Sequence, residues 1–130
     1  MPPNAPQTSI LIVEDDAVTL ETYARILRME GYDVRTALGA VEGWRAVESR
    51  RPDAILVDLR MPNVDGLAFL RRLRDRGEHR DIPVGVVTGD YNVAETVREE
   101  LETPLHAELR YKPLWVDDLK LLIRQLVTKD

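Results

Sequence analysis

The sequence predicts an α/β protein with a five-stranded, doubly wound parallel sheet and helices on both faces. Short apolar runs of strand length alternate five times with longer segments of helical period, which is typical of strands joined by helical crossovers. The run at 53–58 is apolar between its two end aspartates, as expected for a central parallel strand buried on both faces. With 130 residues and no internal repeat, the chain has the size of one domain with one real core.

Apolar spacing and helix-ending residues define the expected elements. We expect strands at 9–13, 32–37, 53–58, 82–88 and 107–111. We expect helices at 17–30, 40–50, 65–76, 91–102 and 115–127. Gly31 stands where the first helix should stop, and Trp44 lies on a helix face that we expect to be buried. Residues 1–8 hold three prolines and no apolar pattern, which predicts a loose tail before a domain at 9–130.

Composition and charge exclude several classes of function. The net charge of −5 argues against broad binding to nucleic acid or to an anionic membrane. The chain has no cysteine and no apolar stretch near the roughly 18 residues of a membrane span, so we expect a cytoplasmic protein without thiol chemistry. The arginine-rich run at 71–76 is interrupted by Asp75 and is interpreted as a solvated helix face. His79 and His106 are interpreted as surface residues.

Four polar stretches each follow an apolar run of strand length. They are Val13-Glu14-Asp15-Asp16, Val57-Asp58-Leu59-Arg60-Met61-Pro62, Val87-Thr88-Gly89 and Tyr111-Lys112-Pro113. Parallel strands present their carboxyl ends along one edge of a sheet, where ligands bind in this class of fold. The sequence therefore predicts that carboxylates, a hydroxyl and an ammonium group meet at one site.

The residue types at this predicted site suit magnesium-dependent phosphoryl transfer. Glu14, Asp15 and Asp58 would bring three negative charges together, and each like-charge pair costs about 3 kcal/mol at ~5 Å and an effective dielectric of ~20. A cation or a role in chemistry must offset that cost. Mg²⁺ prefers oxygen ligands, usually one or two carboxylates with waters and a phosphate. A carboxylate can also act as the nucleophile toward phosphorus. Lys112 and Thr88 could then hold two phosphoryl oxygens.

Each stretch alone has a simpler interpretation. Residues 14–16 could be a solvated turn whose carboxylates cap a helix, and Asp16 in particular is expected to cap the first helix. Thr88 could merely end a strand, and Lys112 could be an ordinary surface lysine. The four stretches taken together favour a common site over these separate interpretations.

Along nearly its whole length, the chain resembles the receiver domain of two-component response regulators. The resemblance rests on the acidic pair after the first strand, on Asp58 followed by Met61-Pro62 and Asp65-Gly66, on Thr88-Gly89 and on Lys112-Pro113. Each motif alone is weak, but their order and spacing together are specific. The resemblance implies a flavodoxin-like fold with strand order 2-1-3-4-5. It also implies phosphorylation of Asp58 by a histidine kinase or a histidine phosphotransfer protein.

The resemblance assigns a Mg²⁺ site to the acidic cluster. It implies that Asp15 is the main metal carboxylate and that Glu14 helps through a water molecule. Asp58 would be both phosphoryl acceptor and metal ligand, and Arg60 would lend its backbone carbonyl to the metal. A protein of this kind catalyses only its own phosphorylation and dephosphorylation, and it is not an enzyme with a separate substrate.

Further roles at the phosphoryl site follow from the same resemblance. It implies that Thr88 and Lys112 hold the phosphoryl group and that the Lys112–Pro113 bond is cis. The residues two positions after the acceptor and two after the threonine, Arg60 and Asp90, would flank the path of the attacking water. A salt bridge between them would slow hydrolysis, whereas an aspartate that orients water would speed it, and both readings stay open.

The switch of such a domain would run from Thr88 to a surface made by the fourth helix, fifth strand and fifth helix. An aromatic residue usually stands three positions before the lysine, but here that position is Leu109, and Tyr111 lies next to the lysine instead. The surface would bind a downstream effector protein or domain, or form a weak homodimer. Trp115 could be an exposed contact there, or could pack on Leu114 or a neighbouring helix.

Two other functions remain as alternatives. A small haloacid-dehalogenase-type phosphatase would also use an aspartate nucleophile and magnesium, but it wants a second aspartate where this chain has Arg60. A receiver can also serve as an unphosphorylated docking module. These residues include no effector domain, so the receiver either stands alone or belongs to a longer chain. The Met1 start with its proline-rich tail leads us to expect a stand-alone protein.

Overall fold

A computed structural model describes residues 7–59 and 66–128, and it confirms the predicted fold. Five parallel strands form one sheet in the order β2-β1-β3-β4-β5. The strands are β1 (Ser9–Glu14), β2 (Asp33–Leu38), β3 (Ala54–Asp58), β4 (Val84–Thr88) and β5 (Ala107–Tyr111). The helices are α1 (Ala17–Met29), α2 (Ala40–Ser49), α3 (Gly66–Asp75), α4 (Glu95–Glu102) and α5 (Val116–Val127). No helix in the described ranges is long and apolar enough to cross a membrane.

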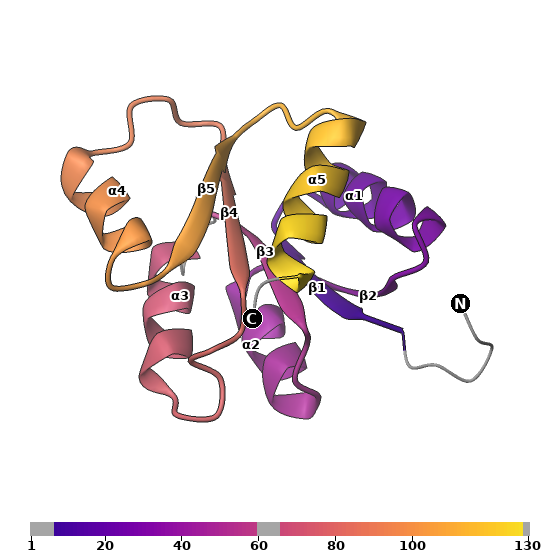
Figure 1. Cartoon of the computed structure of the whole chain (residues 1–130), viewed down its shortest axis with the longest axis horizontal. Coiled ribbons are helices and arrows are strands. Elements are labelled where there is room, and N and C mark those ends of the chain that lie inside the picture. Colours follow the sequence, from indigo (N-terminus) through magenta and orange to yellow (C-terminus); the bar gives the residue numbers. More distant parts are fainter. Residues whose placement is uncertain (1–6, 60–65, 129–130) are drawn as a thin grey trace.

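The helices cover the sheet in two layers, with α1 and α5 on one face and α2, α3 and α4 on the other (Figure 1). Each layer encloses its own apolar cluster. One cluster is built around Trp44, Phe69 and Leu70 against β1, β3 and β4. The other is built around Leu27 and Leu122. Because β1, β3 and β4 are buried along their whole length, only their carboxyl ends can offer polar side chains to a ligand.

The first helix begins and ends where its sequence predicts. The Asp16 carboxylate caps α1 by accepting a hydrogen bond from the Thr19 amide at 3.1 Å. Gly31, just past the helix, has φ +94°, a left-handed conformation that favours glycine. Most of the predicted 1–8 tail lies outside the described residues. Gln7, which is described, donates a hydrogen bond to the Gly31 carbonyl at 3.0 Å.

The fourth helix begins later than expected, at Glu95 instead of residue 91. The Asp90 side chain accepts a hydrogen bond from the Asn92 amide at 2.9 Å, which holds the chain in a turn instead of a helix. The ring of Tyr91 then stacks on Tyr111 of β5. This contact between distant segments overrides the local helical pattern. The expected start of the third helix, at Asp65, lies outside the described residues.

Two expectations about surface residues were wrong. His79 is only 7% exposed, because the turn after α3 brings its ring against the edge of Trp44, with centroids 6.1 Å apart. Arg74 is not a solvated member of the 71–76 run, since its guanidinium donates to the carbonyls of Leu105 and Ile82 at 2.7 Å each. Arg74 thereby ties α3 to the segment that leads into β5. Trp44 is buried, as predicted.

Candidate functional site

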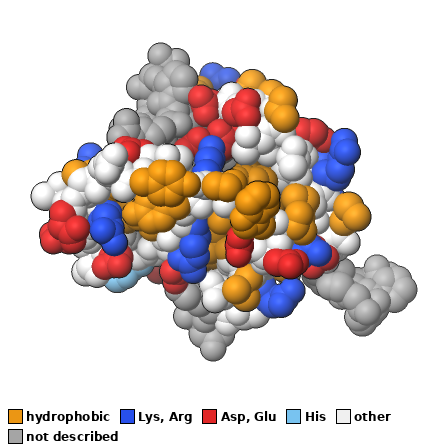
Figure 2. Space-filling model, turned by 90° about the horizontal axis from the view of Figure 1, so that it is seen from above, with side chains coloured by type: hydrophobic (Ala, Val, Ile, Leu, Met, Phe, Trp, Pro, Cys, Tyr) orange, Lys and Arg blue, Asp and Glu red, His pale blue; other side chains and the backbone are white. Residues whose placement is uncertain are grey.

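The carboxyl edge of the sheet brings the predicted site residues together. Glu14 ends β1, Asp58 ends β3 and Thr88 ends β4, while Lys112 follows β5 directly. The register aligns these ends, since Val13 pairs with Val57, and the Lys112 amide donates to the Thr88 carbonyl at 2.8 Å. Figure 2 looks down on the top of Figure 1, where these strands end, and shows acidic side chains beside a basic one with hydrophobic side chains on both sides.

Three carboxylates and one ammonium group form the centre of the site. Glu14, Asp15 and Asp58 each place a carboxylate oxygen within 4.8 Å of the others. The Lys112 Nζ donates to Asp58 Oδ2 at 3.0 Å and to Glu14 Oε2 at 3.2 Å. Glu14 and Asp58 are 3% and 6% exposed, whereas Asp15 is exposed. One lysine therefore faces up to three carboxylates, and the centre carries a net negative charge while all three are ionised.

Burial and proximity shift the proton affinities of two of these groups. Burial, followed by the hydrogen bond and negative charge of Asp58, raises the pKa of Glu14 from 4.5 to about 7, although Lys112 opposes the shift. Burial alone would lower the pKa of Lys112. The hydrogen bond to Asp58 and the charges of Asp58 and Glu14 outweigh that effect, so the pKa of Lys112 is raised. Lys112 therefore stays charged, and Glu14 titrates near neutral pH in the metal-free protein.

The donor set fits a hard divalent cation. Carboxylate oxygens from two strand ends and the following loop are the ligands that Mg²⁺ prefers. Asp15 is exposed and so can reach a hydrated ion, while Glu14 also accepts a hydrogen bond from the Asp16 amide at 3.2 Å. Asp16 itself turns away to cap α1. The expected carbonyl ligand, Arg60, lies outside the described residues.

Thr88 connects the centre to the turn that precedes α4. Its side chain is fully buried, and its Oγ1 accepts a hydrogen bond from the Asp90 amide at 3.0 Å. Because the amide uses the oxygen as acceptor, the hydroxyl hydrogen can still be donated to a ligand. Asp90 is half-buried at this turn. Its expected salt bridge with Arg60 would involve a residue outside the described ranges.

Tyr91 is a residue at the rim of the site that the sequence did not single out. Its ring stacks on Tyr111 with centroids 5.5 Å apart and an interplanar angle of 20°. Its hydroxyl donates to the Lys112 carbonyl, next to the cis Lys112–Pro113 bond that the resemblance implied. Leu109 packs instead against the apolar cluster under α2, α3 and α4. Two features of the sequence could have pointed to another aromatic pair, namely the lack of an aromatic residue at Leu109 and the presence of Tyr111 beside Lys112.

Gly66 lies close to the backbone at the end of β3, which carries Asp58. Its amide donates to the Leu59 carbonyl at 2.9 Å, and a Cβ atom at this position would lie 2.2 Å from the Asp58 carbonyl oxygen. No other residue fits without moving the backbone that carries Asp58. The glycine therefore belongs to the structure of the site although it offers no side chain.

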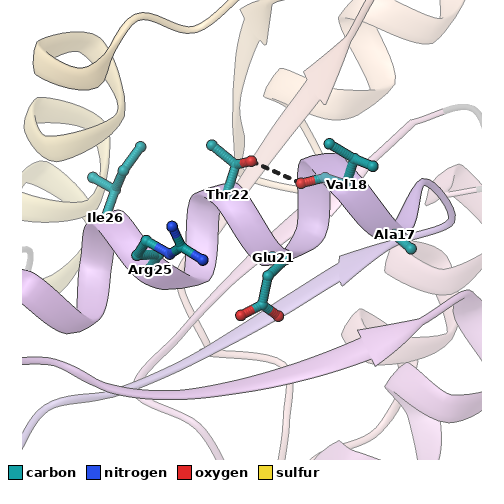
Figure 3. A pocket seen from close by; sticks show the side chains of 6 residues that line it. All are labelled: Ala17, Val18, Glu21, Thr22, Arg25 and Ile26. Atoms are coloured by element: carbon teal, nitrogen blue, oxygen red, sulfur yellow. Dashed lines mark hydrogen bonds between the residues drawn. The ribbon is translucent and has the colours of Figure 1, made fainter.

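Two connected grooves lie beside the centre. One, of about 460 Å³, is lined by residues that include Tyr23, Gly89, Tyr91, Lys112 and Leu114. The other, of about 430 Å³, runs along the outer face of α1 and is shown in Figure 3 with its six lining side chains. The two share Val18, which is 74% exposed, and Thr22. Together they form a largely apolar surface from α1 to the loop that carries Lys112.

Comparison with known proteins identifies the family. The family model described as the response regulator receiver domain matches residues 10–124. The chain belongs to this family. Among curated proteins, it is 40% identical over 88 residues to the response regulator MprA of Mycobacterium sp. (strain KMS). It is 41% identical over the same length to MprA of Mycobacterium ulcerans (strain Agy99). Both alignments cover 68% of this chain but 37% of the relative, so the chain matches only part of those proteins.

Solved receiver structures have the same fold. The chain superposes on a response regulator receiver protein from Pseudomonas putida with a TM-score of 0.79 at 30% identity, covering 93% of this chain and 98% of the other. It superposes on the receiver domain of NtrX from Brucella abortus with a TM-score of 0.81 at 28% identity, covering 93% and 99%. Membership of the receiver family is therefore supported by both sequence and fold.

Proposed function

We propose that this receiver domain, at residues 9–130, accepts a phosphoryl group on Asp58 from a phosphohistidine of a sensor kinase or phosphotransfer protein. The observation that carries the proposal is the position of Asp58, buried at the end of β3 with Lys112 Nζ 3.0 Å from its carboxylate. A buried carboxylate is costly unless it is paired with an opposite charge. Here Lys112 faces not only Asp58 but two further carboxylates within 4.8 Å of it, and these repel Asp58. Such a cluster serves chemistry better than it serves stability.

Each described residue of the cluster has a role in the transfer. An Asp58 oxygen attacks phosphorus as the phosphorus–nitrogen bond to histidine breaks, and the released imidazole takes up a proton from solvent. Lys112 moves from the carboxylate to one phosphoryl oxygen, and Thr88 donates its hydroxyl hydrogen to another. Asp15 and Glu14, with Asp58 and the Arg60 carbonyl, would hold Mg²⁺, which would supply charge neutralisation at the phosphoryl oxygens.

Water later attacks the phosphorus atom, the phosphorus–oxygen bond to Asp58 breaks, and inorganic phosphate leaves. The protein thus returns to its starting state without converting a separate substrate. We propose that Arg60 and Asp90 control this step. An arginine–carboxylate fork across the mouth would hinder the attacking water, since such a pair is geometrically specific. The half-buried position of Asp90, two residues after Thr88, supports this assignment.

The α1 surface suits a histidine-bearing helical partner. The two connected grooves run from the α1 face to Lys112, and Val18 leaves an apolar side chain exposed between them. A helix that lies there would bury apolar surface and bring a histidine toward Asp58. A cytoplasmic kinase domain or phosphotransfer protein fits this description, and the location in the cytoplasm stays a prediction.

The output surface would be formed by α4, β5 and α5. Thr88 leads through Asp90 to Tyr91, whose stacking on Tyr111 couples the turn before α4 to β5. We propose that this pair, and not Leu109, responds when Thr88 moves toward the phosphoryl group. Trp115, 70% exposed at the start of α5, would contact an effector or a second copy of the domain.

Labelling with acetyl phosphate and Mg²⁺ tests the proposal. Intact-mass measurement should show one added phosphoryl group on the parent, none on Asp58→Asn, and an unchanged gain on Asp53→Asn. Asp53 is a suitable control because it directly precedes the same strand but lies on the surface. Its carboxylate accepts a hydrogen bond from the Ser9 amide. No label on the parent would favour an unphosphorylated docking module. Turnover of a phosphate ester would favour the phosphatase alternative.

A further inference from the structure

A notch on the opposite side of the sheet from α1 has no role in the proposed phosphorylation. It lies between α2 and α3, which are neighbours on the same face of the sheet (Figure 1). Its volume is about 270 Å³, which leaves room for one large apolar side chain. It is lined by Ala40, Val41, Trp44, Arg45, Glu48, Ala68, Phe69 and Arg72.

The floor of the notch is aromatic and its walls are open. Trp44 and Phe69 meet edge to face with centroids 5.8 Å apart, and both are almost fully buried. On the α3 side, the lining includes the small side chain of Ala68, which takes up little of the space. Val41 on the α2 wall is 57% exposed, so an apolar group stands at the entrance. An aromatic floor with an exposed apolar rim is favourable for burying an apolar side chain from outside.

The charges at the rim specify the kind of partner. Arg45 on α2 and Arg72 on α3 are both exposed, and neither pairs with a carboxylate among the described residues. Arg72 instead lies over the Trp44 ring, 4.2 Å from its centroid. Glu48 is the one acidic residue of the lining, and its Oε2 forms a salt bridge with Arg76 Nη2 at 2.8 Å. Two guanidinium groups on opposite walls are therefore available to carboxylates.

This basic rim stands out on an acidic protein. The chain carries a net charge of −5, whereas α3 alone has three arginines and one aspartate, a sum of +2. A duplex nucleic acid would meet the repulsion of the remaining charge and would not place an apolar group in the notch. A partner that offers a few carboxylates around one apolar side chain matches both features.

We propose that the α2–α3 notch is a docking site for an acidic peptide segment of another protein, anchored by one aromatic or large aliphatic side chain. The anchor rests on Trp44 and Phe69, and flanking carboxylates pair with Arg45 and Arg72. This surface does not include Asp58 or the grooves along α1, so docking is independent of the proposed phosphorylation. A partner could be bound here while the carboxyl edge of the sheet is free for a kinase.

The test uses a capped Asp-Glu-Phe-Glu-Asp peptide as probe on a Trp115→Phe parent, in which Trp44 is the remaining tryptophan. We expect the peptide to change the fluorescence emission of Trp44 in a saturable way. We also expect it to change the NMR chemical shifts of backbone amides in α2 and α3 alone. Arg45→Gln and Arg72→Gln should each weaken binding by about two- to fivefold, the range for exposed ion pairs. Higher salt should weaken it further. Arg25→Gln, an exposed arginine of α1, is the control and should leave binding unchanged.

Further experiments distinguish an acidic peptide from the other possible occupants of the notch, which are nucleic acid and a second copy of the chain. Ala68→Leu should fill the notch and abolish binding, and the two arginine variants keep the test valid if that variant does not fold. A peptide with alanine in place of phenylalanine, or with lysines in place of the acids, should bind at least several-fold more weakly. Equal binding of either peptide, or no binding of the probe, overturns the proposal. Displacement of the probe by duplex DNA overturns it in favour of nucleic acid. Self-association that Ala68→Leu abolishes overturns it in favour of a second copy.

Discussion

Replacing Glu14 by glutamine should make the metal-free protein more stable at alkaline pH. Glu14 is 3% exposed and shares Lys112 with Asp58. Burial, then the hydrogen bond and charge of Asp58, raise its pKa from 4.5 to about 7. Glutamine has the same shape and can still accept the hydrogen bond from Lys112, but it carries no charge. The substitution therefore removes a buried charge and its repulsion by Asp58, and it leaves the packing unchanged.

The magnitude follows from the pKa shift. The difference between about 7 and 4.5 is about 2.5 pKa units, which corresponds to about 3 kcal/mol. Between these pH values, the folded state still holds a proton that the unfolded state has released. The free energy of unfolding therefore falls as the pH rises from 4.5 to about 7. Above about pH 7, Glu14 causes no further loss of stability. We expect Glu14→Gln to match the parent near pH 4 and to exceed it by about 1–3 kcal/mol at pH 8.

Urea denaturation in EDTA at several pH values between 4 and 8 measures this difference. Glu99→Gln removes an exposed carboxylate of α4 and should reproduce the parent profile. Saturating Mg²⁺ should stabilise the parent by about 2.7 kcal/mol at 100 times its Kd, and should stabilise Glu14→Gln less. A Glu14→Gln profile parallel to that of the parent, or lower stability at pH 8, would refute the convergence of the carboxylates. So would the absence of any Mg²⁺ effect on the parent.

Four further substitutions test other parts of the molecule. Gly66→Ala should lower the free energy of unfolding by about 3 kcal/mol and reduce acetyl phosphate labelling, because its Cβ would lie 2.2 Å from the Asp58 carbonyl oxygen. Leu101→Ala should cost about 2–5 kcal/mol in urea denaturation, since Leu101 is the fully buried residue of α4. Arg60→Ala and Asp90→Ala should each accelerate loss of the phosphoryl group, with non-additive effects in the double variant. Slower loss in Asp90→Ala would instead make that residue a helper of hydrolysis.

Much of the fold and site was predictable because the signals are local. The buried strand Ala54–Asp58 shows as an apolar run, and Gly31 marks the end of α1 through its own backbone preference. The strand ends at Glu14, Asp58 and Thr88 then follow from the parallel topology alone, because such a sheet collects its carboxyl ends on one edge. We could therefore expect these residues at one edge without knowing how far apart or how buried their side chains are.

Other features depend on contacts between distant segments, which leave little trace in the chain. The spacing of residues 91–102 predicts a helix throughout, but the stacking of Tyr91 on Tyr111 delays α4 to Glu95. His79 looks like a surface histidine because its neighbours are charged, yet the turn after α3 presses it against Trp44. In both cases, packing between elements outweighs a weak local preference.

The residue types of the site and their order along the chain were legible from the sequence, since each lies at the end of its own strand. The tertiary structure decided how those residues interact. The burial of Glu14 and the approach of Asp58 raise the pKa of Glu14, and the path of β5 brings Lys112 to both carboxylates. The α2–α3 notch likewise exists only after two helices pack side by side. Burial, charge proximity and cavity shape arise from how elements pack together, and no single segment of the chain contains them.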